Sequence, residues 1–102
     1  MMFRRARFTQ VIDAQLDLFE QDHRDVIDDA DARLESYNRA GRGEAEELYG
    51  DYLDAVETGT EILADMRDHY AQSLEDSDGY LREFNQAVAR RLPPFALEIE
   101  NR

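Results

Sequence analysis

The 102-residue chain contains no cysteine, no tryptophan and no lysine, and it has only two prolines. Without cysteine the protein can form no disulfide, no thiolate metal site and no cysteine nucleophile. No stretch is long and apolar enough to span a membrane, and acidic residues (Asp13, Asp17 and Glu20) interrupt the region where a secretory signal would need its apolar segment. We therefore expect a cytoplasmic protein with no membrane partner.

Positive charge is also scarce. The 12 basic residues are all arginines, and they face 24 acidic residues, which gives a net charge of −12. A surface this negative repels phosphate groups, so we expect no nucleic-acid partner. The use of arginine alone with abundant aspartate is typical of a high-GC genome, and it fits a salt-adapted cytoplasm. Because ions screen such self-repulsion, we expect stability to rise with salt.

Apolar residues recur at steps of three and four in two long segments, which are separated by Ala40-Gly41-Arg42-Gly43. This spacing marks one face of an α-helix. It predicts an all-α fold: helices over about Arg4–Arg39 and Gly43–Glu75 form a long antiparallel hairpin, with Gly41 just past the end of the first. The first stripe is Ile12, Leu16, Phe19, His23, Val26, Ala30 and Tyr37, and the second is Tyr49, Tyr52, Val56, Gly59, Leu63, Met66 and Tyr70.

A short third helix is predicted after a break at Asp76–Gly79, with Ser77 or Asp78 as its N-cap. The alternative is one long kinked helix, because the apolar stepping continues through the break. Pro93-Pro94 ends the third helix. Beyond it, large apolar residues alternate with others at a period of two, which predicts an extended tail. The chain is thus divided into a helical hairpin domain over 1–94 and an extended C-terminal tail over 95–102.

Both stripes are wider than the seam between two helices requires, which favours a homodimeric four-helix bundle. Val11 and Leu18 lie off the first stripe and would receive the third helix or a partner. The apolar side of the tail would either fold back over these two residues or bind a partner's groove or sheet edge. The predicted partner-binding residues are Val11, Leu18, Phe95, Leu97 and Ile99.

One pair of residues suggests metal chemistry. Glu20-x-x-His23 has the spacing of the Glu-x-x-His motif of four-helix di-iron proteins, and it stands on the first stripe. The simpler interpretation is a buried histidine that bonds to Glu20 or to a tyrosine hydroxyl. The alternative is a ferritin-like site at a dimer interface, with iron or another divalent metal as cofactor. Glu57 and Glu61 lie at the matching level of the second helix, but they point away from its stripe.

The function predicted from the sequence is therefore non-catalytic. We expect an acidic helical-bundle interaction or scaffold protein that self-associates, binds a protein partner and needs no cofactor. The alternative is the carboxylate–histidine metal-binding bundle. No serine–histidine–aspartate set and no phosphate-binding glycine loop is present in the sequence.

Overall fold

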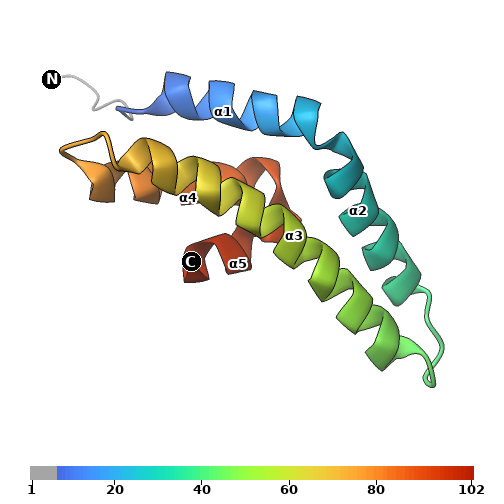
Figure 1. Cartoon of the computed structure of the whole chain (residues 1–102). Helices are drawn as coiled ribbons and strands as arrows, with labels where there is room; N and C mark the ends of the chain where they lie inside the picture. The colour runs from blue at the N-terminus through green and yellow to red at the C-terminus, as the bar shows by residue number, and fades with distance from the viewer. Residues whose placement is uncertain (1–6) are drawn as a thin grey trace, which may run out of the picture.

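The computed structural model describes residues 7–102, and this part of the chain contains helices and no strand (Figure 1). The expected all-α fold is confirmed. Within this range, no helix is both long enough and apolar enough to cross a membrane. The elements are α1 (Thr9–Asp22), α2 (Arg24–Asn38), α3 (Ala45–Ala71), α4 (Ser77–Arg91), the short 3-10 helix η1 (Pro93–Phe95) and α5 (Ala96–Asn101).

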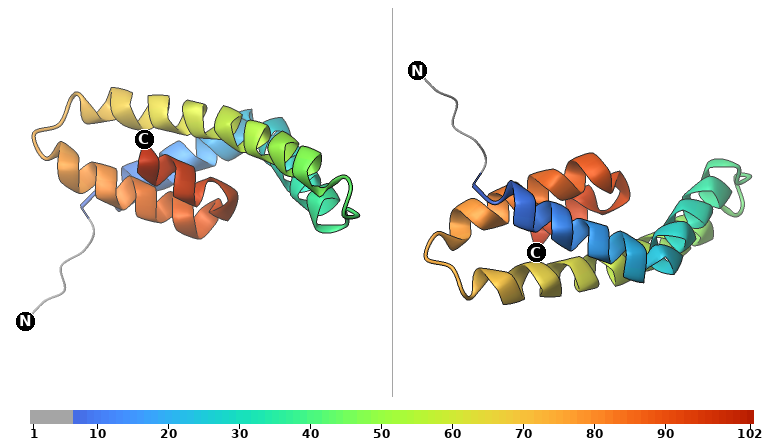
Figure 2. Two further views of the ribbon diagram at one scale, coloured as in Figure 1. Left: turned by 90° about the horizontal axis from the view of Figure 1, so that it is seen from below. Right: turned by 90° about the horizontal axis from the view of Figure 1, so that it is seen from above.

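The described chain divides into a body and an arm, and its extents are 56 × 30 × 23 Å. The arm, residues 24–58, consists of α2 and the first half of α3, which lie side by side and antiparallel. The pair projects from the body (Figure 2). The body contains α1, the second half of α3, α4, η1 and α5. Because α3 runs through both parts, it packs on α2 in the arm and on α4 and α5 in the body.

The hydrophobic core lies in the body, where side chains from all of its elements meet. The largest fully buried side chains are Tyr80, Phe19, Phe84, Phe95, Leu16, Leu63, Ile99, Val88 and Thr60. Phe19 of α1 meets the ring of Phe95 edge to face, with the centroids 6.2 Å apart. The wide stripe of α3 is thus covered in the body by other helices of the same chain.

The continuous helix expected over Arg4–Arg39 is wrong, because the chain leaves helical geometry at His23 (φ −126°, ψ 36°). Residues 4–6 of that prediction lie outside the described part. The His23 N–H still donates to the Phe19 carbonyl at 2.8 Å, and its own carbonyl accepts from Val26 at 3.0 Å. The kink lets α1 follow α4 in the body while α2 follows α3 in the arm, which one straight helix could not do.

The break expected near residue 76 is confirmed, and α4 starts at Ser77. Its N-cap is Asp76, one residue before the earlier of the two expected caps, and the Asp76 carboxylate accepts from the Gly79 N–H at 3.1 Å. One turn further, Glu83 accepts the backbone N–H groups of Arg7 and Phe8 at 3.2 and 3.0 Å. The start of α4 therefore also fixes the chain where it enters α1.

The extended tail expected over 95–102 is also wrong, because Pro93–Phe95 forms a 3-10 turn and Ala96–Asn101 forms α5. Phe95 and Ile99, four residues apart, are fully buried, whereas Leu97 is 69% exposed. The segment folds back onto the body, but not over the residues expected. It covers Gly59, where an added Cβ would overlap the ring of Phe95.

Candidate functional site

The predicted metal ligands Glu20 and His23 lie at the C-terminal end of α1, and they contact different residues. The Glu20 carboxylate accepts from Arg91 of α4 at 2.9 Å, and its other oxygen lies 3.9 Å from Arg24. His23 is half-buried at the kink, with its ring 5.4 Å from that of Phe19. Within residues 7–102, no three histidine, cysteine or acidic residues gather closely enough to hold a metal ion. Within one described chain, this donor set is therefore smaller than a di-iron centre requires.

Arg91 of α4 pairs with the acidic face of α1. Its guanidinium donates to Asp17 at 2.7 Å and to Glu20 at 2.9 Å, and it lies 3.9 Å from the Asp13 carboxylate. Burial lowers the pKa of Arg91, but the hydrogen bond to Asp17 and the charge of Glu20 raise it more, so the net direction is upward. This cluster joins α1 to α4 and pairs the Glu20 carboxylate with an arginine.

A second buried arginine holds α5 in place. Arg67 of α3 is only 3% exposed. Its guanidinium donates to the Asp68 carboxylate at 2.7 Å, to the Asn85 side-chain oxygen at 3.0 Å and to the Ile99 carbonyl at 3.0 Å. Since those partners belong to α3, α4 and α5, Arg67 ties three helices together, and its role is structural.

Tyr80 has the most strongly shifted pKa among the described residues. It is fully buried between α1 and α3, and its hydroxyl donates to Gln15 at 2.8 Å. Burial raises the pKa of Tyr80 to about 12, and the hydrogen bond to Gln15 offsets part of that effect. A phenol that stays protonated at neutral pH and lies inside the core is not placed to act as an acid or base on a ligand.

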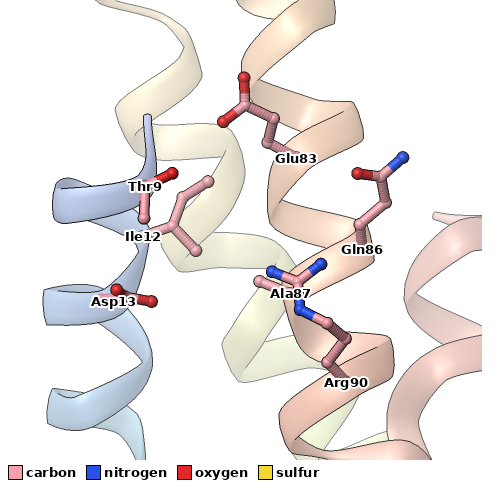
Figure 3. A pocket seen from close by; sticks show the side chains of 7 residues that line it. All are labelled: Thr9, Ile12, Asp13, Glu83, Gln86, Ala87 and Arg90. Carbon is pink, nitrogen blue, oxygen red and sulfur yellow. The ribbon is translucent and has the colours of Figure 1, made fainter. Parts of the chain in front are cut away.

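The cleft between α1 and α4 is small, with a volume of about 70 Å³ (Figure 3). Its walls are Thr9, Ile12, Asp13, Glu83, Gln86, Ala87 and Arg90. Glu83 is already engaged by the start of α1. Small-molecule sites typically enclose about 300–1,000 Å³. The cleft is therefore a seam between two helices, too small for a substrate.

Another hollow lies in the arm, between α2 and α3, and holds about 270 Å³. It contains one arginine among three aspartates, and Arg33 lies 3.1 Å from Asp29 and 3.9 Å from Asp51. The lining residues are Asp29, Arg33, Asp51, Asp54, Ala55 and Thr58. This hollow is open and acidic, and Arg33 pairs with the aspartates that line it, so it provides no enclosed reaction site.

The structure separates the five predicted partner-binding residues. Phe95 and Ile99 are part of the core, and Val11 is half-buried against it. Leu18 is 51% exposed on α1, and Leu97 is 69% exposed on α5. They therefore do not form one surface.

Comparison with protein-family models, with curated proteins and with solved structures finds no match.

The arm carries an exposed apolar pair, Tyr49 and Leu53. Tyr49 belongs to the second apolar stripe, whereas Leu53, one turn later, is not among the residues predicted to bind a partner. Their side chains are 44% and 41% exposed, and together with Leu18 and Leu97 they are the large apolar residues most open to solvent between residues 7 and 102. The available signal was the i, i+4 spacing of Tyr49 and Leu53, which places both on one edge of the stripe.

Proposed function

We propose that this is a non-catalytic interaction protein, in which the body holds the α2–α3 arm out to bind another protein chain. Several observations support this proposal. No three metal-ligating side chains gather within residues 7–102, the cleft between α1 and α4 is only about 70 Å³, and the arginines Arg67 and Arg91 join helices. A packed body that carries a projecting helical pair is an arrangement suited to recognition.

The observation that carries the proposal is the exposed pair Tyr49 and Leu53 on the arm. In the body each wide helical stripe is covered by a third or fourth element, whereas the arm has only two helices. Large apolar residues next to one another on a surface are typical of binding sites, and tyrosine is enriched where protein interfaces concentrate their binding energy.

Self-association is a second candidate for the use of this surface. Two arms laid face to face would form the homodimeric four-helix bundle that the width of the stripes favours. Residues 24–58 contain eleven acidic residues and four arginines, so two arms repel each other at low salt. We expect a dimer to form at molar KCl, where ions screen this repulsion, and to dissociate as the salt is removed.

The proposal can be tested by introducing a photo-crosslinking amino acid at position 53 in cells of the native host. The same amino acid at position 97 is the matched control, because Leu97 is equally apolar and more exposed but lies on the body. We expect discrete protein adducts from position 53 and none from position 97. Adducts of twice the chain mass would identify a second copy, and other masses a different protein. If position 53 gives no adduct in these cells, the arm is not a binding surface.

A further inference from the structure

The exposed pair on the arm continues a face of α3 that is fully buried in the body. Tyr49, Leu53, Thr60 and Arg67 follow one another at steps of four and seven, which keeps them on one side of the helix. The exposed fraction falls along this face from 44% and 41% at Tyr49 and Leu53 to 0% and 3% at Thr60 and Arg67. The same face of the same helix is therefore covered at one end and open at the other.

The cover over the buried end is a short amphipathic helix of the chain itself. In α5 and the turn before it, Phe95 and Ile99 face inward, and the Ile99 carbonyl accepts from Arg67 at 3.0 Å. The final residue, Arg102, lies 3.8 Å from Glu57, which is one turn from Leu53. At the C-terminal end of α5, Arg102 thus pairs with the acidic Glu57 of α3.

The open end is framed by aromatic rings and by acidic side chains. The ring of Tyr49 lies 5.1 Å from that of Tyr37 and 6.2 Å from that of Tyr52. Burial raises the pKa of Tyr52, and the neighbouring Tyr49 and then the charge of Asp31 on α2 raise it further. Glu46 of α3 is exposed and stands one turn before Gly50.

We propose that this open face binds a basic amphipathic helix of a partner protein. The apolar side of that helix covers Tyr49 and Leu53, and its arginines or lysines meet acidic residues such as Glu46 and Glu57. This is the helix-in-groove mode of recognition, and it repeats the way α5 covers the adjoining part of α3. The inference rests on the proposed function, because it names the chemistry of the chain that the arm binds.

Charge favours this occupant over a second copy at ordinary ionic strength. The arm carries eleven acidic residues and four arginines. A basic helix removes much of that self-repulsion, whereas a second arm doubles it. The two occupants consequently respond to salt in opposite directions: a basic helix binds more weakly as salt rises, and a second copy binds more strongly.

The test uses a fluorescein-labelled 18-residue helical peptide with leucines at heptad a and d positions and lysines elsewhere, and a second peptide in which glutamates replace the lysines. Fluorescence anisotropy is measured with the full chain at 50 and 500 mM KCl. The protein variants are Leu53→Ser and, as control, Leu97→Ser. Both remove an exposed leucine and leave the net charge unchanged, and circular dichroism checks that each variant is folded.

We expect the lysine peptide to bind and the glutamate peptide not to bind. Leu53→Ser should raise the Kd of the lysine peptide about tenfold, because it removes a leucine from the covered surface, and Leu97→Ser should leave it unchanged. Equal Kd values for both variants would mean non-specific attraction to an acidic protein and would overturn the inference. Equal binding of the glutamate peptide would do the same. If binding fails while position 53 still crosslinks in cells, the partner class is wrong and the proposed function stands.

Discussion

Gly59 and Gly50 provide the sharpest test of how α3 is packed. Both glycines lie inside the same helix, so replacing either one with alanine brings the same gain in helix propensity. A Cβ added at Gly50 meets nothing within 4 Å, whereas a Cβ at Gly59 overlaps the ring of Phe95. The two substitutions are chemically identical and differ only in what lies opposite.

The expected magnitudes follow from these surroundings. Gly50→Ala should raise the free energy of unfolding by about 1 kcal/mol, which is the difference in helix propensity between the two residues. Gly59→Ala gains the same amount, but it forces the fully buried Phe95 ring to move against its neighbours, at a cost of about 1–3 kcal/mol. We expect Gly59→Ala to be less stable than the native chain by about 1 kcal/mol, which separates the two variants by about 2 kcal/mol.

Thermal unfolding followed by circular dichroism measures this difference. For a domain of this size, a separation of about 2 kcal/mol corresponds to melting temperatures on the order of 10 °C apart. In a Phe95→Leu background, which removes the ring, adding Gly59→Ala should no longer destabilise. The packing of η1 over α3 described here would be refuted if Gly59→Ala raised the melting temperature as Gly50→Ala does, or if it destabilised the Phe95→Leu chain equally.

Three further predictions concern the body. Arg67→Ala should lower the free energy of unfolding by about 3 kcal/mol in urea titrations, because it leaves buried acceptors unpaired, while Arg82→Ala, on an exposed position of α4, should change it by less than about 0.5 kcal/mol. Ile99→Ala should lower the free energy of unfolding by about 2–4 kcal/mol and lower the melting temperature with it, whereas Leu97→Ala should change the melting temperature very little. Equal effects of the two substitutions would mean that α5 is not docked on the body. Because the pKa of Tyr80 is raised to about 12 in the folded chain, its contribution to stability is complete below pH 10 and is lost as the pH rises from 10 to about 12; Tyr80→Phe should remove this part of the pH dependence.

Local features of the chain determined the parts of the fold that were predicted correctly. The steps of three and four between apolar residues indicate helices wherever they occur, because that period belongs to one helix face. Gly41 and Gly43 stand in the segment between α2 and α3, and Asp76 stands at the start of α4, where an aspartate can accept free backbone N–H groups. Each of these signals acts within a few residues, so sequence alone was sufficient.

Tertiary structure decided which neighbour each stripe received. A stripe shows that a face must be covered, but the period is the same whether the cover is another part of the chain or a second molecule. Phe95 and Ile99 alternate with smaller or charged residues as a strand would, yet their spacing of four also fits one turn of a helix, and the body of α3 and α4 selected the helix. The kink at His23 has the same origin, since no proline or glycine marks it.

In the candidate site, too, the sequence determined some features and the tertiary structure decided others. The pattern identified Glu20 and His23 by their spacing, but only the folded chain placed Arg91 against Glu20, because that contact joins residues 71 positions apart. Exposure is likewise a property of the whole fold. Tyr49 and Leu53 belong to the same helix face as the buried Thr60 and Arg67, and what distinguishes them is that they lie in the arm, whereas η1 and α5 pack on the body. The sequence determined which residues are apolar, and the tertiary structure determined which of them remain uncovered.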